Sequence, residues 1–395
     1  MIDRAVSEEM MPALNLLVLK NGAEVLYHEA GDIHRDNVLR MFSMTKPLTG
    51  FAAMLLLERG EITLGDPLER YIPEFAGVRV VDPATKEIRV RRRPIYIKDL
   101  LCMTSGLSYP GDKNDPSAAA SGVIFDEMDR RLYTDDPVTT NEFAVMMAER
   151  GLLAFEPGES WLYGTSADIM GAVIEIISGV SFNEFMRREI FEPLGMEDTA
   201  FYCPTEKSDR LAKAYEYPRW IVNPFDPASF CPEEKGTWKP YDRDHLAIKR
   251  KGDAEPAFAS GGAGIFSTLD DYAKFATMLL GGGEYRGRRL MSSEMVKYFT
   301  SGGLTPWQRE RFWKTWDSLA GYDYGNYMRL ALGSSAGQTP QWKGGYGWDG
   351  WLGTYFMNVP DSGLTVLVGT QVTDAGALPY IQQIRNLLYT DKRLR

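Results

Sequence analysis

The first part of the chain carries the signature of a β-hairpin. Residues 14–20 and 24–29 are two runs rich in strand-forming side chains, and Asn21-Gly22 lies between them. An Asn-Gly pair adopts positive φ angles at little cost and closes two-residue turns whose twist matches that of the flanking strands. The sequence therefore predicts that the fold opens with an antiparallel strand pair.

A long apolar helix is predicted to follow this hairpin. The segment PLTGFAAMLLLERG runs from Pro47 to Gly60 and contains few polar residues. Proline is tolerated in the first turn of a helix, and glycine is a common stop signal at its end. We therefore expect Ser43 to lie at the N-terminus of this helix.

The rest of the chain divides into a mostly helical middle and a region in which strands return. Helical periodicity in the middle gives four candidates, at 97–103, 141–150, 166–179 and 182–190. Further along, the pattern predicts helices at 271–280 and 292–299, strands at 327–332, 353–358 and 364–372, and a closing amphipathic helix at 378–389.

Composition and charge exclude several classes of protein. The chain has 395 residues, of which 44% are hydrophobic and 25% charged, as in soluble globular proteins that bury a large core. A net charge of −10 and a pI near 5.1 disfavour binding to nucleic acid or to anionic membranes. We therefore expect a compact protein whose partner is a small molecule, while its oligomeric state stays open.

The cysteines and the first residues bear on the cellular compartment. Cys102, Cys203 and Cys231 are an odd number without metal-ligand spacing, so they do not support a disulfide framework. Charges in the first segment interrupt the apolar run that a secretory signal would need, and no run reaches membrane-spanning length. These features predict a cytoplasmic protein without a membrane segment.

The segment Ser43-Met44-Thr45-Lys46 is a candidate catalytic centre. It fits the pattern S-x-x-K, in which a three-residue step on a helix places the lysine on the same face as the serine. A serine hydroxyl becomes a strong nucleophile when a base takes its proton, and a lysine can be that base when its surroundings keep it partly neutral. The helix N-terminus would add backbone N–H groups beside a developing oxyanion.

Other catalytic patterns are disfavoured. Residues 333–337 match G-x-S-x-G, but that motif requires a helix directly after the serine and a histidine downstream, and His245 is the last histidine. No H-E-x-x-H motif or cysteine–histidine cluster is present, so no metal or other cofactor is expected. The glycines Gly261, Gly262 and Gly264 lack the Lys-Ser/Thr ending of a P-loop and are predicted to form a close-packed turn.

Five blocks of sequence together resemble the serine β-lactamase-like, penicillin-recognising hydrolases, especially their family VIII carboxylesterase branch. They contain FSMTKPLTGF, DLLCMTSGLSY, FEPGESWLYGTSADIMG, ASGGAGIFSTLDDYAKF and GWDGWLGTYF, in the order of that family. The resemblance implies an α/β (α+β) fold with a mainly antiparallel sheet flanked by helices and a mostly helical inserted domain. It divides the chain into a discontinuous sheet domain, 1–66 and 256–395, and a helical domain, 67–255, with the active site between them.

The second motif of that family, Y-x-N, corresponds to Tyr163-Gly164-Thr165. The resemblance gives Tyr163 a catalytic role, because a phenol can exchange a proton with Lys46 and deliver one to a leaving group. Thr165 departs from asparagine, so the contact that this amide makes to the substrate side chain in members with β-lactamase activity is in doubt.

The third motif, K-T-G in β-lactamases and often W-G-G in the esterases, corresponds to Trp348-Asp349-Gly350. A glycine lets the strand edge approach the acyl carbon, and the next backbone N–H, of Trp351, would pair with that of Ser43 as an oxyanion hole. Tryptophan in place of lysine removes a cation that would hold a carboxylate, which favours neutral esters. Asp349 either borders the cleft, where it would hinder anions or attract amines, or points into solvent.

Aromatic residues are candidates for the pocket wall, since ligand clefts are mostly apolar. Trp348 and Trp351 fit a cleft and a core equally well, whereas a core position is favoured for the tryptophans of 307–316 and for Trp342. Tyr109 follows T-S-G-L and is a cleft candidate by resemblance. The predicted substrate-binding set is Tyr109, Thr165, Trp348, Asp349 and Gly350.

The sequence thus predicts a serine hydrolase that forms an acyl-enzyme on Ser43, with Lys46 and Tyr163 as its proton-transfer partners. A carboxylesterase for small neutral esters is the favoured reading of the motifs. The alternatives are an amidase, D-aminopeptidase or β-lactamase-like hydrolase, and a penicillin-binding protein with little turnover. The natural substrate, and whether water or an alcohol releases the acyl group, stay undetermined.

Overall fold

The computed structural model describes residues 1–217, 238–252, 254–333, 341–375, 379–392 and 394. Two predictions fall outside this range. Cys231 is not described, and neither is most of the rejected G-x-S-x-G segment, 333–337. The two cysteines that are described, Cys102 and Cys203, are both free and buried.

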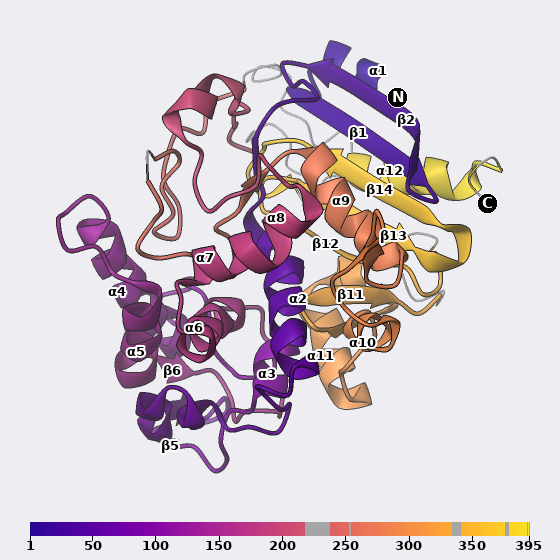
Figure 1. Cartoon of the computed structure of the whole chain (residues 1–395). Coiled ribbons are helices and arrows are strands. Elements are labelled where there is room, and N and C mark those ends of the chain that lie inside the picture. Colours follow the sequence, from indigo (N-terminus) through magenta and orange to yellow (C-terminus); the bar gives the residue numbers. More distant parts are fainter. Residues whose placement is uncertain (218–237, 253, 334–340, 376–378, 393, 395) are drawn as a thin grey trace.

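A seven-stranded sheet forms the upper right part of the molecule in Figure 1. Every pairing within it is antiparallel, which confirms the predicted fold class. The sheet joins strands from the two ends of the chain, because the first strand pairs with the last. In spatial order the strands are β10 (Tyr322–Gly325), β11 (Met328–Ala331), β12 (Tyr346–Asp349), β13 (Tyr355–Val359), β14 (Leu364–Gly369), β1 (Ala13–Lys20) and β2 (Ala23–Gly31).

The predicted hairpin is confirmed as the pair β1 and β2. Its turn residues have φ angles of 51° at Asn21 and 77° at Gly22, as a tight two-residue turn with positive φ requires. A register shift between Val18 and Leu19 adds one irregularity that the sequence pattern did not indicate.

The sheet is buried on both faces, because successive side chains of a strand point to opposite sides. In β1 the residues Leu14, Leu16 and Val18 pack in the cluster that also contains residues of α1 (Ile2–Ser7) and α12 (Pro379–Thr390). The alternate residues Ala13, Leu17 and Leu19 belong to the large core that contains α2 (Thr45–Glu58) and α9 (Leu269–Leu280). Helices therefore cover both faces.

Helix α2 lies at the centre of the molecule, between the sheet and the helices of the lower left in Figure 1. All of its residues from Thr45 to Leu56 are buried. It packs against α6 (Ser166–Ser178) on one side and against α10 (Ser293–Phe299) on the other. A helix that is apolar all round belongs in the interior, as its sequence indicated.

The helical middle agrees with the predicted segments and adds one helix. Helices α3 (Ile97–Leu101), α5 (Thr140–Arg150) and α6 lie where periodicity placed them. The segment predicted at 182–190 contains α7 (Phe182–Met186), the π-helical turn Arg187–Phe191 and α8 (Glu192–Leu194). The proposed boundaries of the two domains stay a prediction.

Helix α4 (Pro116–Arg131) was not predicted. Its buried stripe includes Ser117 and Ser121 beside Ile124, Phe125 and Met128. Two serines in the stripe weaken the apolar period that identifies an amphipathic helix. Asp115 caps the helix by accepting the backbone N–H groups of residues 117 and 118.

The remaining elements are short. The structure also contains α11 (Pro306–Thr315), β3 (Leu39–Arg40) paired with β7 (Phe266–Ser267), the strands β4 (Arg79–Val81), β5 (Ile88–Val90) and β6 (Leu152–Leu153), and the hairpin of β8 (Glu284–Tyr285) and β9 (Arg288–Arg289). Single 3-10 turns occupy Phe42–Met44, Leu68–Arg70, Pro73–Gly77, Thr205–Arg210, Asp317–Leu319 and Pro360–Ser362.

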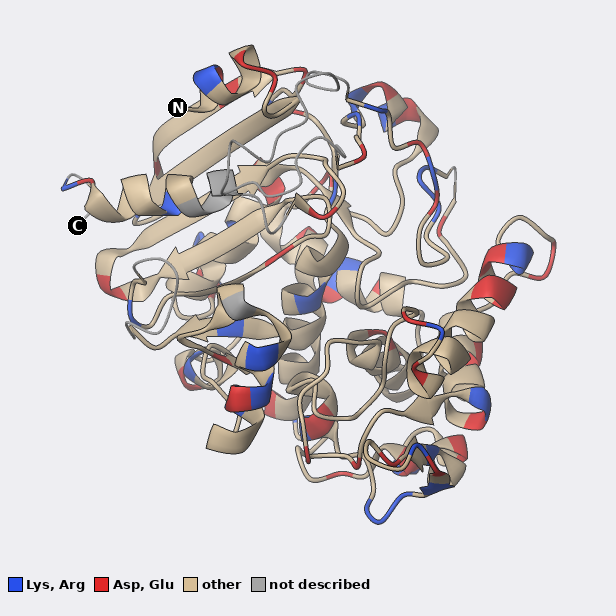
Figure 2. Cartoon of the chain, turned by 180° about the vertical axis from the view of Figure 1, so that it is seen from behind, with Lys and Arg blue, Asp and Glu red and all other residues tan. Residues whose placement is uncertain are grey.

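Charged residues lie mainly on the outer helices and loops, and the central strands carry few of them (Figure 2). Among the described residues, no single helix has both the length and the hydropathy needed to cross a membrane. One pair, Ser166–Ser178 and Phe182–Leu194, meets those limits only jointly and is bent by 82° at the break.

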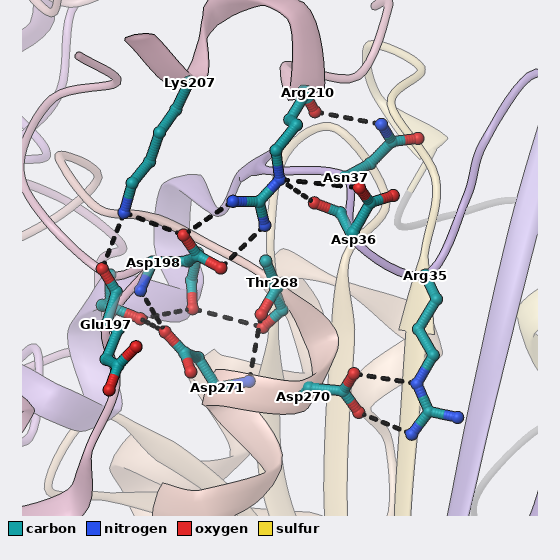
Figure 3. Close-up of polar contacts among 12 residues, drawn as sticks. Arg35, Asp36, Asn37, Glu197, Asp198, Lys207, Arg210, Thr268, Asp270 and Asp271 are labelled. Atoms are coloured by element: carbon teal, nitrogen blue, oxygen red, sulfur yellow. Dashed lines mark hydrogen bonds and ion pairs between the residues drawn. The ribbon is translucent and has the colours of Figure 1, made fainter.

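A network of ion pairs joins the segment before β3 to α9 and to the 3-10 turn at Thr205–Arg210 (Figure 3). The carboxylate of Asp198 accepts two hydrogen bonds from the guanidinium of Arg210, at 2.7 and 2.9 Å, and forms an ion pair with the Lys207 amine at 2.8 Å. Arg35 binds Asp270 in the first turn of α9 at 2.9 Å. The network fixes the chain shortly before it enters the turn that contains Ser43.

Within the network, Asp271 is the buried acceptor. Its carboxylate accepts the backbone N–H of Asp198 at 2.7 Å and the hydroxyl of Thr199 at 3.1 Å, and it pairs with Lys274 at 2.7 Å. Removal of this carboxylate would leave buried hydrogen-bond donors without an acceptor, which lowers the stability of the folded state.

We expect Asp271→Ala to lower the free energy of unfolding by about 2–3 kcal/mol, because a buried, multiply bonded carboxylate is lost. The adjacent Asp270→Ala is the matched control, since it removes a carboxylate from the same helical turn that makes an exposed ion pair worth about 0–1 kcal/mol. Urea denaturation of the two variants measures the difference. Equal losses would contradict this account of the network.

Candidate active site

Ser43 lies in a 3-10 turn, Phe42–Met44, immediately before α2. The sequence placed it at the helix start, and the structure places it in the short turn that leads directly into the first helical residue, Thr45. Phe42 has a φ of 45°, in the left-handed region that a bulky side chain adopts only at a cost. The edge of its ring meets Trp351 at 5.2 Å between centroids. The residue before the candidate nucleophile is therefore held in a strained conformation by packing.

Lys46 is fully buried, and its amine makes three hydrogen bonds. The Nζ donates to Ser43 Oγ at 3.1 Å, to the Tyr109 hydroxyl at 3.1 Å and to the Gly262 carbonyl at 2.9 Å. Burial lowers the pKa of Lys46 to about 7, against an opposing effect of Asp168. Near neutral pH a large fraction of this amine is therefore unprotonated and able to accept a proton from Ser43.

Tyr163 lies partly buried beside the same pair. Its hydroxyl accepts a hydrogen bond from Trp348 Nε1 at 3.0 Å, and the nearby Ser43 hydroxyl acts to lower its pKa. Lys46 Nζ lies 4.4 Å from the centroid of the Tyr163 ring. Burial raises the pKa of this phenol, so it carries its proton at neutral pH. The structure thus brings together the three side chains that the sequence selected.

Asp168 is the main residue of the site that the sequence analysis missed. It lies in the first turn of α6, is 1% exposed, and accepts the Ser260 hydroxyl, the Gly262 N–H at 3.0 Å and the Tyr109 hydroxyl at 3.3 Å. A lone aspartate in an apolar helix was the available signal, but an acid in a first helical turn has an ordinary explanation in the helix dipole. Only the fold shows that it faces the partners of Lys46.

The glycine-rich turn is close-packed, as predicted. A Cβ atom on Gly261 would lie 2.2 Å from the carbonyl oxygen of Ala167. One on Gly262 would lie 2.4 Å from the Tyr109 hydroxyl and 2.7 Å from Asp168. Contacts this close leave room only for glycine at the two positions. The turn can therefore present the Gly262 carbonyl to the amine of Lys46.

The strand that carries the third motif contributes Gly350 and Trp351. A Cβ on Gly350 would meet Thr354 Oγ1 at 2.1 Å and the Met41 carbonyl at 2.3 Å. The glycine is thus required by the neighbouring chain, where the sequence argument invoked the substrate. Among the described residues, the backbone N–H of Trp351 has no hydrogen-bond partner. It is therefore free to bind an oxygen atom of a ligand.

Asp349 makes a contact that neither sequence alternative foresaw. Its carboxylate accepts hydrogen bonds from both terminal guanidinium nitrogens of Arg329 on the neighbouring strand β11. Arg329 is buried and lies 5.0 Å from the ring centroid of Tyr355, on the sheet face of the α1 and α12 cluster. A bidentate pair of this kind is strong and satisfies both partners. Asp349 also borders the cavity beside Ser43, as one of the two sequence alternatives expected, and the alternative of a carboxylate in solvent is corrected.

Thr165 and Tyr109 occupy positions behind the cavity. Thr165 is fully buried at the N-cap of α6, and its hydroxyl has no hydrogen-bond partner among the described residues. It does not border the cavity, so the geometry gives no support to its predicted substrate contact. Tyr109 likewise does not border the cavity and contacts Lys46 and Asp168 instead.

A cavity of about 240 Å³ opens beside Ser43 and Tyr163. Its wall includes Trp348, Trp351 and Trp316. The core position favoured for Trp316 is wrong, because this side chain is 38% exposed and borders the cavity. The tryptophan lies at the end of a polar helix, α11, whose sequence does not indicate which face meets the site.

Asp374, Ser318 and Leu319 complete the missed part of the wall. Asp374 follows the last strand and accepts the Trp351 Nε1–H at 2.7 Å. None of the three belongs to a motif, so the sequence offered no signal for them. Among the described residues, no group of three or more His, Cys, Asp or Glu side chains is arranged to hold a metal ion.

Comparison with known proteins matches a family model described as Beta-lactamase to residues 2–383. The lovastatin esterase of Penicillium rubens is 32% identical over 251 residues, which cover 62% of this chain and 55% of that protein. Esterase EstB of Burkholderia gladioli is 26% identical over 405 residues, which cover 98% of this chain and 93% of that protein. A solved structure, EstCE1, is described as a hydrolase with promiscuous acyltransferase activity and has a TM-score of 0.76 at 22% identity. The match covers 98% of this chain and 96% of that chain.

The buried amine predicts how the reactivity of Ser43 depends on pH. We expect its acylation by an activated ester to rise about tenfold per pH unit below about pH 7, and to level off above it, because only the neutral amine accepts a proton. Asp168 favours the charged amine, so Asp168→Asn should move the midpoint of this rise to lower pH, by about one unit.

The measurement is the single-turnover acylation rate between pH 5 and pH 9. Asp361→Asn, in the exposed turn between β13 and β14, serves as the control that changes the net charge equally. A midpoint that stays in place in Asp168→Asn, or a wild-type rate that is flat from pH 6 to pH 8, would remove Lys46 from the role of base.

Proposed function

The chain belongs to the beta-lactamase family of serine hydrolases, and on this premise we propose that it is a carboxylesterase that forms an acyl-enzyme on Ser43. The observation that carries the proposal is the close grouping of Ser43, Lys46 and Tyr163, in which Lys46 Nζ donates to Ser43 Oγ at 3.1 Å and lies 4.4 Å from the centroid of the Tyr163 ring. The proposed nucleophile and proton donor, Ser43 and Tyr163, border one cavity, and the proposed base, Lys46, lies buried behind them. This is the arrangement that two-step acyl transfer needs.

In the first step the Ser43 oxygen attacks the ester carbonyl and its proton passes to Lys46 Nζ, 3.1 Å away. The C–O bond to the alcohol then breaks, and the departing alkoxide takes a proton from Tyr163. The proton on Lys46 restores the phenol, since the amine lies against the Tyr163 ring. In the second step water attacks the acyl-enzyme by the reverse proton path and releases the acid.

The developing oxyanion needs donors that are already in place. The N–H groups of Ser43 and Trp351 are the proposed pair. Support comes from the free N–H of Trp351 and from Gly350, whose close contacts with Met41 and Thr354 bring the third-motif strand against the Ser43 turn. Such a strand edge positions a backbone N–H without any side-chain rearrangement.

The residues of the cavity wall favour esters over acidic peptides as substrates. Among the described lining residues none is lysine or arginine, and Trp348 fills the motif position of the lysine that would bind a carboxylate. The asparagine of the second motif is also replaced, by the buried Thr165. Small esters without a negative charge are the substrates that such a wall accepts at least cost.

We expect Ser43→Ala to lower kcat for a short-chain p-nitrophenyl ester by at least about 10³-fold, because the covalent step loses its nucleophile. Ser318→Ala is the matched control, since it removes a hydroxyl from the same cavity wall and should change kcat by less than about threefold. Intact mass after mixing with a slow acylating ester should show one acyl group on the wild type only. Unchanged turnover in Ser43→Ala would overturn the assignment.

Parallel assays separate the esterase from the other activities of such a site. Steady-state rates are compared for simple esters, D-amino-acid amides and a chromogenic cephalosporin. Faster turnover of the amides or the cephalosporin would replace the esterase proposal with an amidase or β-lactamase-like one. A persistent β-lactam adduct without ester turnover would indicate a penicillin-binding protein.

A further inference from the structure

Aromatic rings dominate the wall of the cavity beside Ser43. Trp316, Trp348 and Trp351 border it together with Tyr163. The ring centroids of Tyr163 and Trp316 lie 5.0 Å apart, and those of Trp316 and Trp348 lie 6.4 Å apart. The faces of such rings carry partial negative charge and attract a cation within about 6 Å of the centroid. The wall therefore has the character of a site for an organic cation.

The two carboxylates on the wall differ in their charge balance. Asp349 is neutralised by the bidentate contact with the buried Arg329. Asp374 accepts one hydrogen bond, from Trp351 Nε1, and forms no ion pair with any residue that the structure describes. One negative charge on the wall is therefore uncompensated.

The neighbouring basic groups that the structure describes do not border the cavity, and Lys46 is buried behind Ser43 with its amine bound to Ser43, Tyr109 and Gly262. No described lining residue is lysine or arginine. The ring of His245 stacks on Trp351 at 4.1 Å, and burial together with Arg40 lowers its pKa to about 4, so it is uncharged at neutral pH. Arg40 itself lies against the rings of Phe42 and Tyr241, and it does not border the cavity.

Building on the proposed esterase activity, we propose that this cavity selects esters that carry an organic ammonium group. The ammonium lies against the tryptophan faces, within the field of Asp374, while Ser43 attacks the carbonyl. A neutral ester of the same shape lacks both attractions and is a weaker substrate. An ester with a carboxylate is the weakest, because Asp374 repels it.

A matched pair of esters tests this selectivity. Butyrylcholine and 3,3-dimethylbutyl butyrate have the same shape, since a carbon atom replaces the ammonium nitrogen. At low ionic strength we expect kcat/KM to favour the choline ester by at least about fivefold. The ratio should fall in 0.5 M NaCl, because Asp374 is exposed and salt screens its field.

Asp374→Asn should lower the ratio of the two kcat/KM values by at least about threefold, while Asp361→Asn, an exposed carboxylate in the turn between β13 and β14, should leave it unchanged. Trp316→Leu should also lower the ratio, because one cation-binding face is lost. Equal kcat/KM values in the wild type, or a ratio that Asp374→Asn does not change, would overturn the inference.

Binding to Ser43→Ala keeps this test separate from the proposed activity. Isothermal titration of that variant with the two esters measures the preference without turnover. If the wild type hydrolyses neither ester, the esterase proposal fails and the titration still decides the inference. Tighter binding of butyrylcholine supports the inference, and equal or weaker binding overturns it.

Discussion

The buried amine of Lys46 is the constraint on which the rest of the site depends. An ammonium group taken from water must either lose its proton or find compensating partners, because desolvation of a full charge is expensive. In this chain the amine is partly deprotonated and also has hydrogen-bond partners. Burial brings the pKa of Lys46 to about 7, and Asp168 limits how far it falls. The amine is therefore close to the balance point at which one group can accept and return a proton.

Holding an amine in that state needs acceptors from several parts of the chain. Tyr109 and the Gly262 carbonyl accept hydrogen bonds from it, and Asp168 in turn accepts the Tyr109 hydroxyl and the backbone N–H of Gly262. The contacts are so close that a single Cβ at position 262 would collide with Tyr109 and Asp168. The glycine turn, the start of α6 and the loop before α4 thus together hold the amine of Lys46, the proposed base.

The third-motif strand shows how the alternation of a strand serves two purposes. Trp348 points into the core side of the sheet and donates to Tyr163, while Asp349 points to the opposite face and pairs with Arg329. Successive side chains of a strand necessarily diverge in this way. The aspartate therefore ties β12 to β11 and leaves the charge of the cavity wall to Asp374. Gly350 directly follows this strand, and its small size lets the chain approach Met41.

The sequence by itself determined the parts that depend on local spacing. The turn at Asn21-Gly22 follows from the φ angles that these residues accept, and the three-residue step from Ser43 to Lys46 brings their side chains together on any helical path. Resemblance to a family then supplied Tyr163 and the mainly antiparallel character of the sheet. Helix α4 was not predicted, because two serines in its buried stripe weaken the apolar periodicity.

Only the tertiary structure decided which distant segments complete the site. Asp168, Trp316 and Asp374 lie on separate elements, and nothing in their local sequence distinguishes them from a helix-terminal acid, a packed aromatic or a surface carboxylate. Their roles arise from packing between segments far apart in the chain, which also moved Thr165 into the core and joined Asp349 to Arg329. A local pattern fixes neighbours within one turn or one strand, whereas the pairing of distant side chains is settled by how the whole core closes.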